Sequence, residues 1–342
     1  MKSRCLEAPR NVRRPLLALS LVASIGVLPP AARAQQGAPA GGILSFTFEN
    51  DTFAGTDRYY TAGVRLGWQS TSGAPKPLAA LGRVLSPVLL PDAPVQWGLG
   101  LSESIFTARR TTLHDPPRDD RPYAGVLLGA LSLSAMDADG LGSVELSLGV
   151  IGSNSGAEQL QNGVHELIRV GKAKGWSHQI SSRPAGMLSL ERRWALDAPL
   201  GDSGLAVGIV PAAGLNLGNV QSSAAAGLLA RFGHGLSMDF GPPRIRPALS
   251  GLGVYRAPSG LAWYAFVGLE GRAIAYDATL DGNDHGYWKV EKEPLLAEFP
   301  IGVELAYARA RLSVSGVWQT KSFEEQPRSP FAYGSISLSI QY

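Results

Sequence analysis

Four polar residues of this sequence are of types that can carry out hydrolysis: Asn50, Asp51, Thr61 and His165. A histidine acts as a general base near neutral pH, and a carboxylate with an amide and a hydroxyl can hold a hard cation or stabilise an oxyanion. Spacing alone decides nothing, because 104 residues separate Thr61 from His165. A solvated turn at 49–51 and a surface histidine explain the same residues. Whether the four side chains meet depends on the elements that position them.

The end of the chain indicates what those elements are. Every second residue from Ile336 to Tyr342 is apolar, and the residues between them are Ser or Gln. This period of two predicts a strand. A chain that ends on an aromatic strand residue resembles the assembly signal of bacterial outer-membrane proteins.

Segments of the same kind recur along the chain, at 43–50, 60–70, 96–106, 122–135, 141–152, 185–196, 204–216, 224–234, 261–276, 296–307, 310–320 and 332–342. No stretch after the N-terminal region offers the roughly 18 apolar residues that a membrane helix needs. The twelve segments, an even number, predict an all-β protein, a transmembrane antiparallel β-barrel with one face toward lipid. A soluble all-β fold is the alternative.

The topology of such a barrel brings the polar residues together. If the first strand starts in the periplasm, every odd-numbered connection is extracellular, namely 51–59, 107–121, 153–184, 217–223, 277–295 and 321–331. Asn50, Asp51, Thr61 and His165 then all lie on the external side. Two periplasmic connections, 71–95 and 235–260, are long and Pro-rich, although turns on that side of a barrel are short.

One external loop is predicted to be helical. In residues 156–170, Leu160 and Val164 begin an apolar stripe at helical spacing that continues through 167 and 168. Gln161 and His165 lie four residues apart, so they share a neighbouring face. Such a helix either packs against the barrel rim or lies at the membrane interface, where Trp176 would be an anchor.

The first 34 residues are predicted to form a cleaved signal peptide. A basic start precedes an apolar stretch at 15–27, and Ala32-Arg33-Ala34 is a small-x-small cleavage site. We therefore expect a single mature barrel domain at 35–342, with 25 basic and 27 acidic residues and a net charge of −2. The basicity of the whole chain belongs to the signal and gives no argument for nucleic acid. The only cysteine, Cys5, lies there too, so no disulfide is expected.

Four sequence blocks resemble the outer-membrane lipid A 3′-O-deacylase family over residues 43–342, essentially the whole mature chain. These are Phe48-Glu49-Asn50-Asp51-x-Phe53 with residues 57–63, then 120–125, then Gln161-Asn162-x-x-His165 with Gly175-Trp176, and finally 263–283. Each block is a weak signal, but four in order are specific.

The resemblance implies a twelve-stranded barrel with a calcium-dependent site between the barrel wall and a loop helix. Asn50, Asp51, Thr61 and His165 match functional positions of the family, and Gln161 lies beside them. It further implies that His165 activates water for attack on an ester carbonyl, which Ca²⁺ near Asp51 would polarise.

The sequence departs from the family at two positions. The basic residue that follows the third strand has no clean match, and Arg109 and Arg110 are the candidates for substrate binding. The glutamate found six residues past the histidine in some members corresponds to Gly171.

The expected activity is thus removal of the 3′-linked acyl chain of lipid A in lipopolysaccharide, by an outer-membrane enzyme with an external site. We expect a monomer and no nucleic-acid partner. A porin, a lipid-binding barrel and an outer-membrane phospholipase are the alternatives. Inward-facing positions, expected to be mainly Gly, Ser and Ala with few charges, argue against a wide ionic pore.

Overall fold

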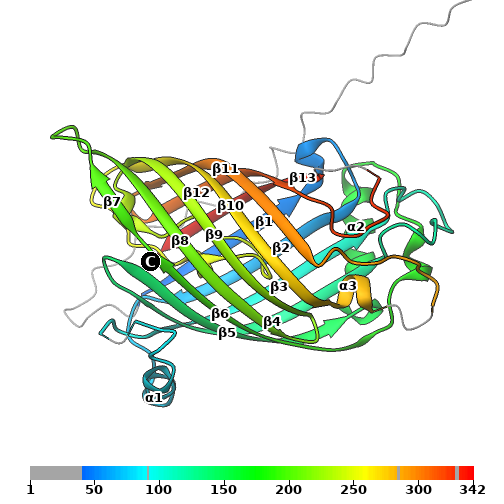
Figure 1. Ribbon diagram of the computed structural model, residues 1–342, viewed down its shortest axis with the longest axis horizontal. Helices are drawn as coiled ribbons and strands as arrows, with labels where there is room; N and C mark the ends of the chain where they lie inside the picture. Colours follow the sequence, from blue (N-terminus) through cyan, green and yellow to red (C-terminus); the bar gives the residue numbers. More distant parts are fainter. Residues whose placement is uncertain (1–40, 91, 283–285, 328–330) are drawn as a thin grey trace, which may run out of the picture. The chain divides into compact units, whose positions relative to one another are not determined.

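A computed structural model describes residues 41–90, 92–282, 286–327 and 331–342 (Figure 1). The predicted signal peptide, 1–34, lies outside the described residues. Thirteen strands form one antiparallel sheet: β1 (Gly42–Asn50), β2 (Tyr59–Ser70), β3 (Gln96–Thr107), β4 (Ala124–Met136), β5 (Gly140–Ile151), β6 (Arg183–Trp194), β7 (Leu196–Pro199), β8 (Leu205–Gly218), β9 (Gln221–His234), β10 (Ala262–Asp277), β11 (Leu295–Tyr307), β12 (Ala310–Gln319) and β13 (Phe331–Gln341).

The sheet closes on itself in two places. The first strand β1 pairs with the last strand β13, and β6 pairs with β8. The four-residue strand β7 pairs with β8 and forms an additional hairpin beside the ring of strands. The barrel therefore has twelve strands, which confirms the predicted fold, and the predicted segments match the observed strands to within about three residues.

Strand alternation sets the two faces of the wall. In β13, Ser335, Ser337 and Ser339 are buried inside, whereas Ile340 is 44% exposed outside. Thr47 of β1 meets Ser337 at 3.0 Å between their hydroxyl oxygens. The outer face exposes leucine, valine, isoleucine and phenylalanine on successive strands, as a wall in contact with lipid requires.

Aromatic side chains gather at one end of the outer face. Trp68 packs edge-on against Trp97, with 4.9 Å between the ring centroids, and its indole N–H donates to Tyr342 Oη at 3.0 Å. Such rings are typical of the boundary between lipid and water. The helix α1 (Lys76–Val84) lies at this end of the barrel, and α2 (Ala157–Leu167) and α3 (Ala278–Asp281) lie at the other (Figure 1).

The lumen is rich in charge, so the expectation of few inward charges was wrong. Buried ionisable side chains of the strands point inward: Glu49, Glu145, Glu191, Arg193, Arg231, Glu270, Arg272, Glu298, Glu304 and Arg311. They are tolerated because they pair with one another or with charged residues of a connecting segment, and Arg231 also pairs with Asp197 of β7.

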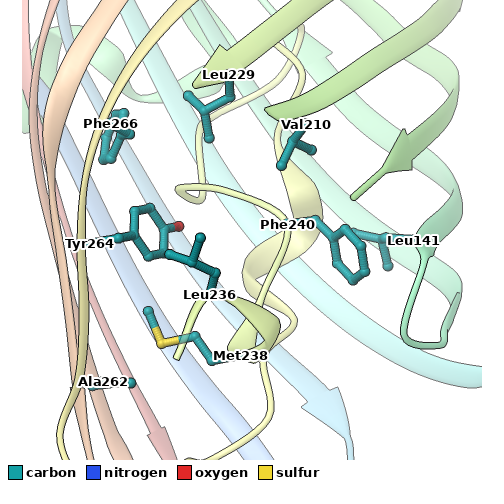
Figure 2. Packing of buried hydrophobic residues seen from close by; sticks show 10 residues of the cluster. Leu141, Val210, Leu229, Leu236, Met238, Phe240, Ala262, Tyr264 and Phe266 are labelled. Atoms are coloured by element: carbon teal, nitrogen blue, oxygen red, sulfur yellow. The ribbon is translucent and has the colours of Figure 1, made fainter. Parts of the chain in front are cut away.

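That segment is residues 235–260, the longer of the two unexpected connections, which we name the luminal segment. It folds back into the barrel and packs Leu236, Met238 and Phe240 in a cluster with Tyr264 and Phe266 of β10 (Figure 2). Its length is thereby explained, because it fills the interior instead of turning at the barrel's edge.

Arginines of the luminal segment reach the inward carboxylates. Arg244 Nη2 lies 3.1 Å from Glu298 Oε2, and its Nε lies 3.4 Å from Glu49 Oε1. Arg246 contacts Glu145 and Glu191, each at 3.3 Å. The segment is therefore bound to strands on several sides of the lumen.

The other long connection, 71–95, covers the outside of the wall. After α1, Leu89 and Leu90 are buried in a cluster with Leu133 and Val144 of β4 and β5. Both long connections thus pack against the barrel, one inside and one outside.

Within the described residues, no helix is long and apolar enough to cross a membrane.

Candidate active site

The helix α2 lies against the outside of the wall, over β3 and β4. Val126 and Leu128 line the lumen, so the alternation of β4 points Gly125 outward. A Cβ at Gly125 would collide with the side chains of Ser155, in the short helix η3 (Ser153–Ser155), and Ala157. Glycine at 125 is what lets the start of α2 approach the wall this closely.

His165 is buried on the side of α2 that faces the barrel. Its Nδ1 lies 2.8 Å from the carbonyl oxygen of Gly171. A carbonyl only accepts, so Nδ1 carries the proton and Nε2 of the neutral ring is left with a lone pair. This is the tautomer that a general base requires at Nε2.

The loop after α2 is fastened to the same helix face. Gln161 Oε1 accepts from the indole N–H of Trp176 at 3.0 Å. Asn162 pairs with the backbone of Ala173 in both directions, at 2.8 and 3.2 Å. These contacts fix the chain that follows Gly171. Trp176 is 2% exposed, so its predicted role as an interfacial anchor was wrong.

Thr61 lies at a register shift in β2, which lets its side chain reach the outer side of the wall. The pairing of β2 with β3 shifts register between Tyr60, which lines the lumen, and Ala62. The inserted residue, Thr61, contacts Thr107 at 2.6 Å between the two hydroxyl oxygens. Ala62 packs in the same cluster as Ala157, so this hydroxyl pair lies beside the wall under α2.

Asn50 and Asp51 are held by local contacts. Asn50 caps the short helix η2 (Asp51–Ala54), because its amide oxygen accepts from Thr52 N at 2.7 Å and also from the Thr52 hydroxyl. Asp51 is fully buried, and its Oδ2 accepts from Thr56 Oγ1 at 2.8 Å and Arg58 N at 2.6 Å. Its Oδ1 has no hydrogen-bond partner.

Burial governs the charge state of Asp51. Desolvation raises the pKa of its carboxyl to about 8, and the nearby carboxylate of Asp57 adds to the rise. Without a cation, this group is therefore mostly protonated at neutral pH.

A chain of contacts connects Asp51 with α2. Asp57 accepts from Thr111 Oγ1 at 3.0 Å, and the carbonyl of Thr111 accepts from Lys174 N at 2.8 Å. Tyr123, next to Thr111, packs against Trp176 with 5.1 Å between ring centroids. The loops that carry Asp51, Thr61, Gln161 and His165 therefore meet at one end of the barrel.

The block at 120–125 has structural partners. Asp120 accepts from the backbone N–H of Arg109 at 3.0 Å. Arg121 is buried and donates to Ser322 and Thr279, each at 2.8 Å, and its burial lowers the pKa of the guanidinium to about 10. These residues tie three loops together, which explains the block without a direct chemical role.

Arg109 and Arg110 are exposed on the loop after β3. The structure brings their backbone near the site, through the contact of the Thr111 carbonyl with Lys174 N. A role for them depends on a bound substrate.

The sequence pattern missed several residues of this region. Glu103 of β3 is buried on the outer side of the wall, close to Ser155, and its Oε1 has no hydrogen-bond partner. Thr107, Asp57 and the carbonyl of Gly171 also escaped notice. An acidic residue at an outward position of a lipid-facing strand was the one signal available for Glu103.

A cavity of about 90 Å³ lies elsewhere, in the lumen. It is lined by residues that include Glu49, Glu145 and Glu298. All three carboxylates are paired with arginines. These three carboxylates are held in ion pairs and are poor candidates for a base, so the outer side of the wall under α2 is the better candidate site.

A metal site can be tested against the residues present. Across the described part of the chain, no three His, Cys, Asp or Glu side chains are arranged to hold a metal ion. The buried, unpartnered Oδ1 of Asp51 nevertheless fits a hard cation, and Ca²⁺ readily completes its shell with backbone carbonyls, amide oxygens and water.

Comparisons with known proteins agree with this architecture. A family model described as "Outer membrane protein LpxR" matches residues 16–342. LpxR from Salmonella typhimurium is similar in structure, with a TM-score of 0.73 and 20% identity over 87% of this chain and 99% of that one. The β domain of the Bordetella autotransporter Brka gives a TM-score of 0.43 and 13% identity, over 89% of this chain and 100% of that one. None of the curated proteins compared with the chain matches it.

Proposed function

This chain belongs to the LpxR family of outer-membrane proteins, and from that premise we propose that it is a lipid A 3′-O-deacylase. In this reaction, water cleaves the ester that joins an acyl chain to the sugar. The products are a free fatty acid and the sugar hydroxyl. The observation that carries the proposal is the contact between His165 Nδ1 and the Gly171 carbonyl, which leaves Nε2 as a base.

In the proposed mechanism, His165 Nε2 takes a proton from water as the water oxygen attacks the ester carbonyl. The imidazolium then returns this proton to the leaving alkoxide of the sugar. Gly171 holds the ring in one orientation through both steps. No acyl-enzyme is required, because water itself attacks the ester carbonyl in this mechanism.

Calcium is the proposed cofactor, with Asp51 as its protein carboxylate ligand. When bound, it would polarise the ester carbonyl. The argument for Asp51 is its buried, unpartnered Oδ1, which a cation would stabilise in the ionised form. Calcium suits this site better than zinc, because zinc favours Cys and His ligands.

Three further residues are assigned supporting roles. Asn50 uses its amide oxygen to cap η2 and so orients Asp51, and its N–H donors remain for the oxyanion. Thr61 offers a hydroxyl beside Thr107. Gln161 holds Trp176, and the indole in turn fixes the loop that carries Gly171.

We further propose that the end of the barrel with α2 and α3 faces the cell exterior, where lipopolysaccharide is found. The enzyme would act there as a monomer. Arg109 and Arg110 would contact anionic groups of the substrate. Their exposed side chains support this role.

Mass spectrometry of lipid A and phospholipids from cells with and without the protein tests the activity. We expect lipid A to lose one acyl chain and phospholipids to stay intact. Loss of acyl chains from phospholipids alone would identify a phospholipase instead. No change in either lipid would leave a non-enzymatic barrel.

A further inference from the structure

The apolar stripe of α2 does not pack against the barrel. Leu160, Val164 and Leu167 are 42%, 45% and 66% exposed, whereas Ala157, Gln161 and His165 are buried against the wall. The usual arrangement of an amphipathic helix on a protein surface is therefore inverted. Exposed apolar residues in such a row need an apolar neighbour.

The buried, the exposed apolar and the exposed polar residues of α2 occupy three different sides of the helix. At about 100° per residue, the buried side is followed on one flank by Leu160, Val164 and Leu167. Gln159 and Glu166, both exposed, lie on the side opposite the buried residues. One side of α2 thus faces the barrel, one is apolar and one is polar, as in a helix that lies in the boundary between lipid and water.

The apolar side continues a surface that already faces lipid. On β3, the outward residues Leu99 and Leu101 are about half exposed, whereas Glu103 and Ile105, further along the same face, are buried under the loop that begins α2. The helix therefore sits on the outside of the wall, directly beyond the lipid-facing band, and not inside the lumen.

Basic residues border the same helix. Arg109 and Arg110 lie next to Thr111, whose carbonyl binds Lys174 N, so the exposed side chains of Lys172 and Lys174 are close by. Cations at this level match the anionic headgroups of a membrane surface.

We propose that the apolar side of α2 is immersed in the membrane leaflet at this end of the barrel, so that a lipid substrate reaches His165 laterally, from the leaflet. The occupant of the apolar face is the acyl-chain region of the leaflet. The position of the helix in the membrane does not depend on the proposed function. The lateral route for the substrate rests on the proposed function.

Site-directed spin labelling tests the position of the helix without any turnover. In a Cys5→Ser background, which has no other cysteine, nitroxides are attached at Leu160→Cys, Leu167→Cys and, as the matched control on the polar side, Gln159→Cys. Leu101→Cys serves as the standard for lipid contact and Asp202→Cys, in the exposed β7–β8 turn, as the standard for water. Collisions with oxygen and with a water-soluble nickel chelate are measured in phosphatidylethanolamine–phosphatidylglycerol vesicles.

We expect labels at 160 and 167 to resemble the label at 101, with a ratio of oxygen to nickel collisions several-fold higher than at 159 and 202. Equal nickel access at 159, 160 and 167 would overturn the proposal, since the stripe would then face water. Low access to both reagents with spin–spin broadening would also overturn it, because a second copy of the chain would cover the face.

The route of the substrate is tested with Leu167→Asp, compared with Gln159→Asp. Leu167→Asp should slow hydrolysis of lipid A in vesicles several-fold more than hydrolysis of lipid A in detergent micelles, and Gln159→Asp should change neither. Equal slowing in both would contradict lateral entry. If the unaltered protein released no fatty acid at all, the proposed function would fail and the collision data would still decide where α2 lies.

Discussion

The imidazole Nδ1 of His165 lies 2.8 Å from the carbonyl oxygen of Gly171, six residues later in the chain. A backbone carbonyl here does what a carboxylate often does for a catalytic histidine: it selects the tautomer and fixes the ring. The carbonyl adds no full negative charge beside the ring. In this chain the orientation of the His165 ring therefore depends on a neutral backbone group at residue 171.

Gly171→Glu tests this interpretation. A carboxylate near the ring would favour the imidazolium, so the acid limb of the pH–rate profile should move to higher pH by about one unit. Gly171→Ala, where a Cβ meets nothing within 4 Å, should leave the profile unchanged. The measurement is fatty-acid release across pH. A strong loss of activity in Gly171→Ala would show that more than the carbonyl is used.

Trp176→Phe removes the indole N–H that donates a hydrogen bond to Gln161 Oε1. An unsatisfied buried amide oxygen costs about 1–3 kcal/mol, so amides of residues 168–176 should exchange hydrogen about 5- to 150-fold faster. Hydrogen exchange with mass spectrometry measures this effect. Trp288→Phe, whose indole binds the carbonyl of His178, is the matched control and should leave 168–173 protected. Unchanged exchange at 168–173 in Trp176→Phe would mean that this clamp does not hold the loop.

Calcium binding should depend on the protonation of Asp51. Because the pKa of Asp51 is raised to about 8, proton and cation compete, and calcium affinity should fall by up to about tenfold per pH unit below that value. Without calcium, the raised pKa stabilises the fold at low pH, and this stability is lost as pH rises from about 4 to about 8. Asp51→Asn should abolish both effects, as titration calorimetry and thermal unfolding can show. Calcium binding by Asp51→Asn with unaltered affinity would rule out Asp51 as the ligand.

The luminal segment should keep the barrel closed to ions. In planar bilayers the protein should give no steady conductance. Arg244→Ala with Arg246→Ala leaves Glu49 without its arginine partner, at a cost of about 3–5 kcal/mol for a broken buried pair, and leaves Glu298 with Arg272 alone. The variant should therefore give intermittent current steps. Arg83→Ala on α1 is the control. Stable conductance by the unaltered protein would favour the porin alternative.

Strand periodicity made most of the fold predictable. Alternation along segments such as 43–50 and 332–342 placed each strand within a few residues, because the lipid-facing side of a barrel must be apolar at every second position. The lumen was not predictable in this way. Its charges are neutralised by Arg244 and Arg246, which lie far away in sequence in a segment that looked like an overlong turn.

The shared end of the barrel at which the candidate residues lie was predictable, but their contacts were not. Because consecutive strands run in opposite directions, Asn50, Asp51, Thr61 and the loop of His165 lie at one end of the barrel. The outward position of Thr61 depends on a register shift that no pattern reveals. The apolar stripe of α2 was visible in the sequence, but its exposure was not, since helical spacing alone does not say which side meets the wall.

His178, a second histidine at this end of the barrel, has partners of its own. It contacts Asp115 at 2.9 Å and stacks on Tyr287 at 4.1 Å between ring centroids. His178→Ala should therefore loosen the loops. His114, which is exposed, is the better control.

The release of fatty acid from lipid A by purified His165→Ala protein tests the central claim most directly. A general base typically contributes about 10²–10⁴-fold to rate, so the variant should lose that factor while the barrel still assembles, and His114→Ala should keep full activity. Heat-modifiable migration on gels reports assembly. A correctly assembled His165→Ala protein that releases fatty acid from lipid A at a near-normal rate would contradict the account.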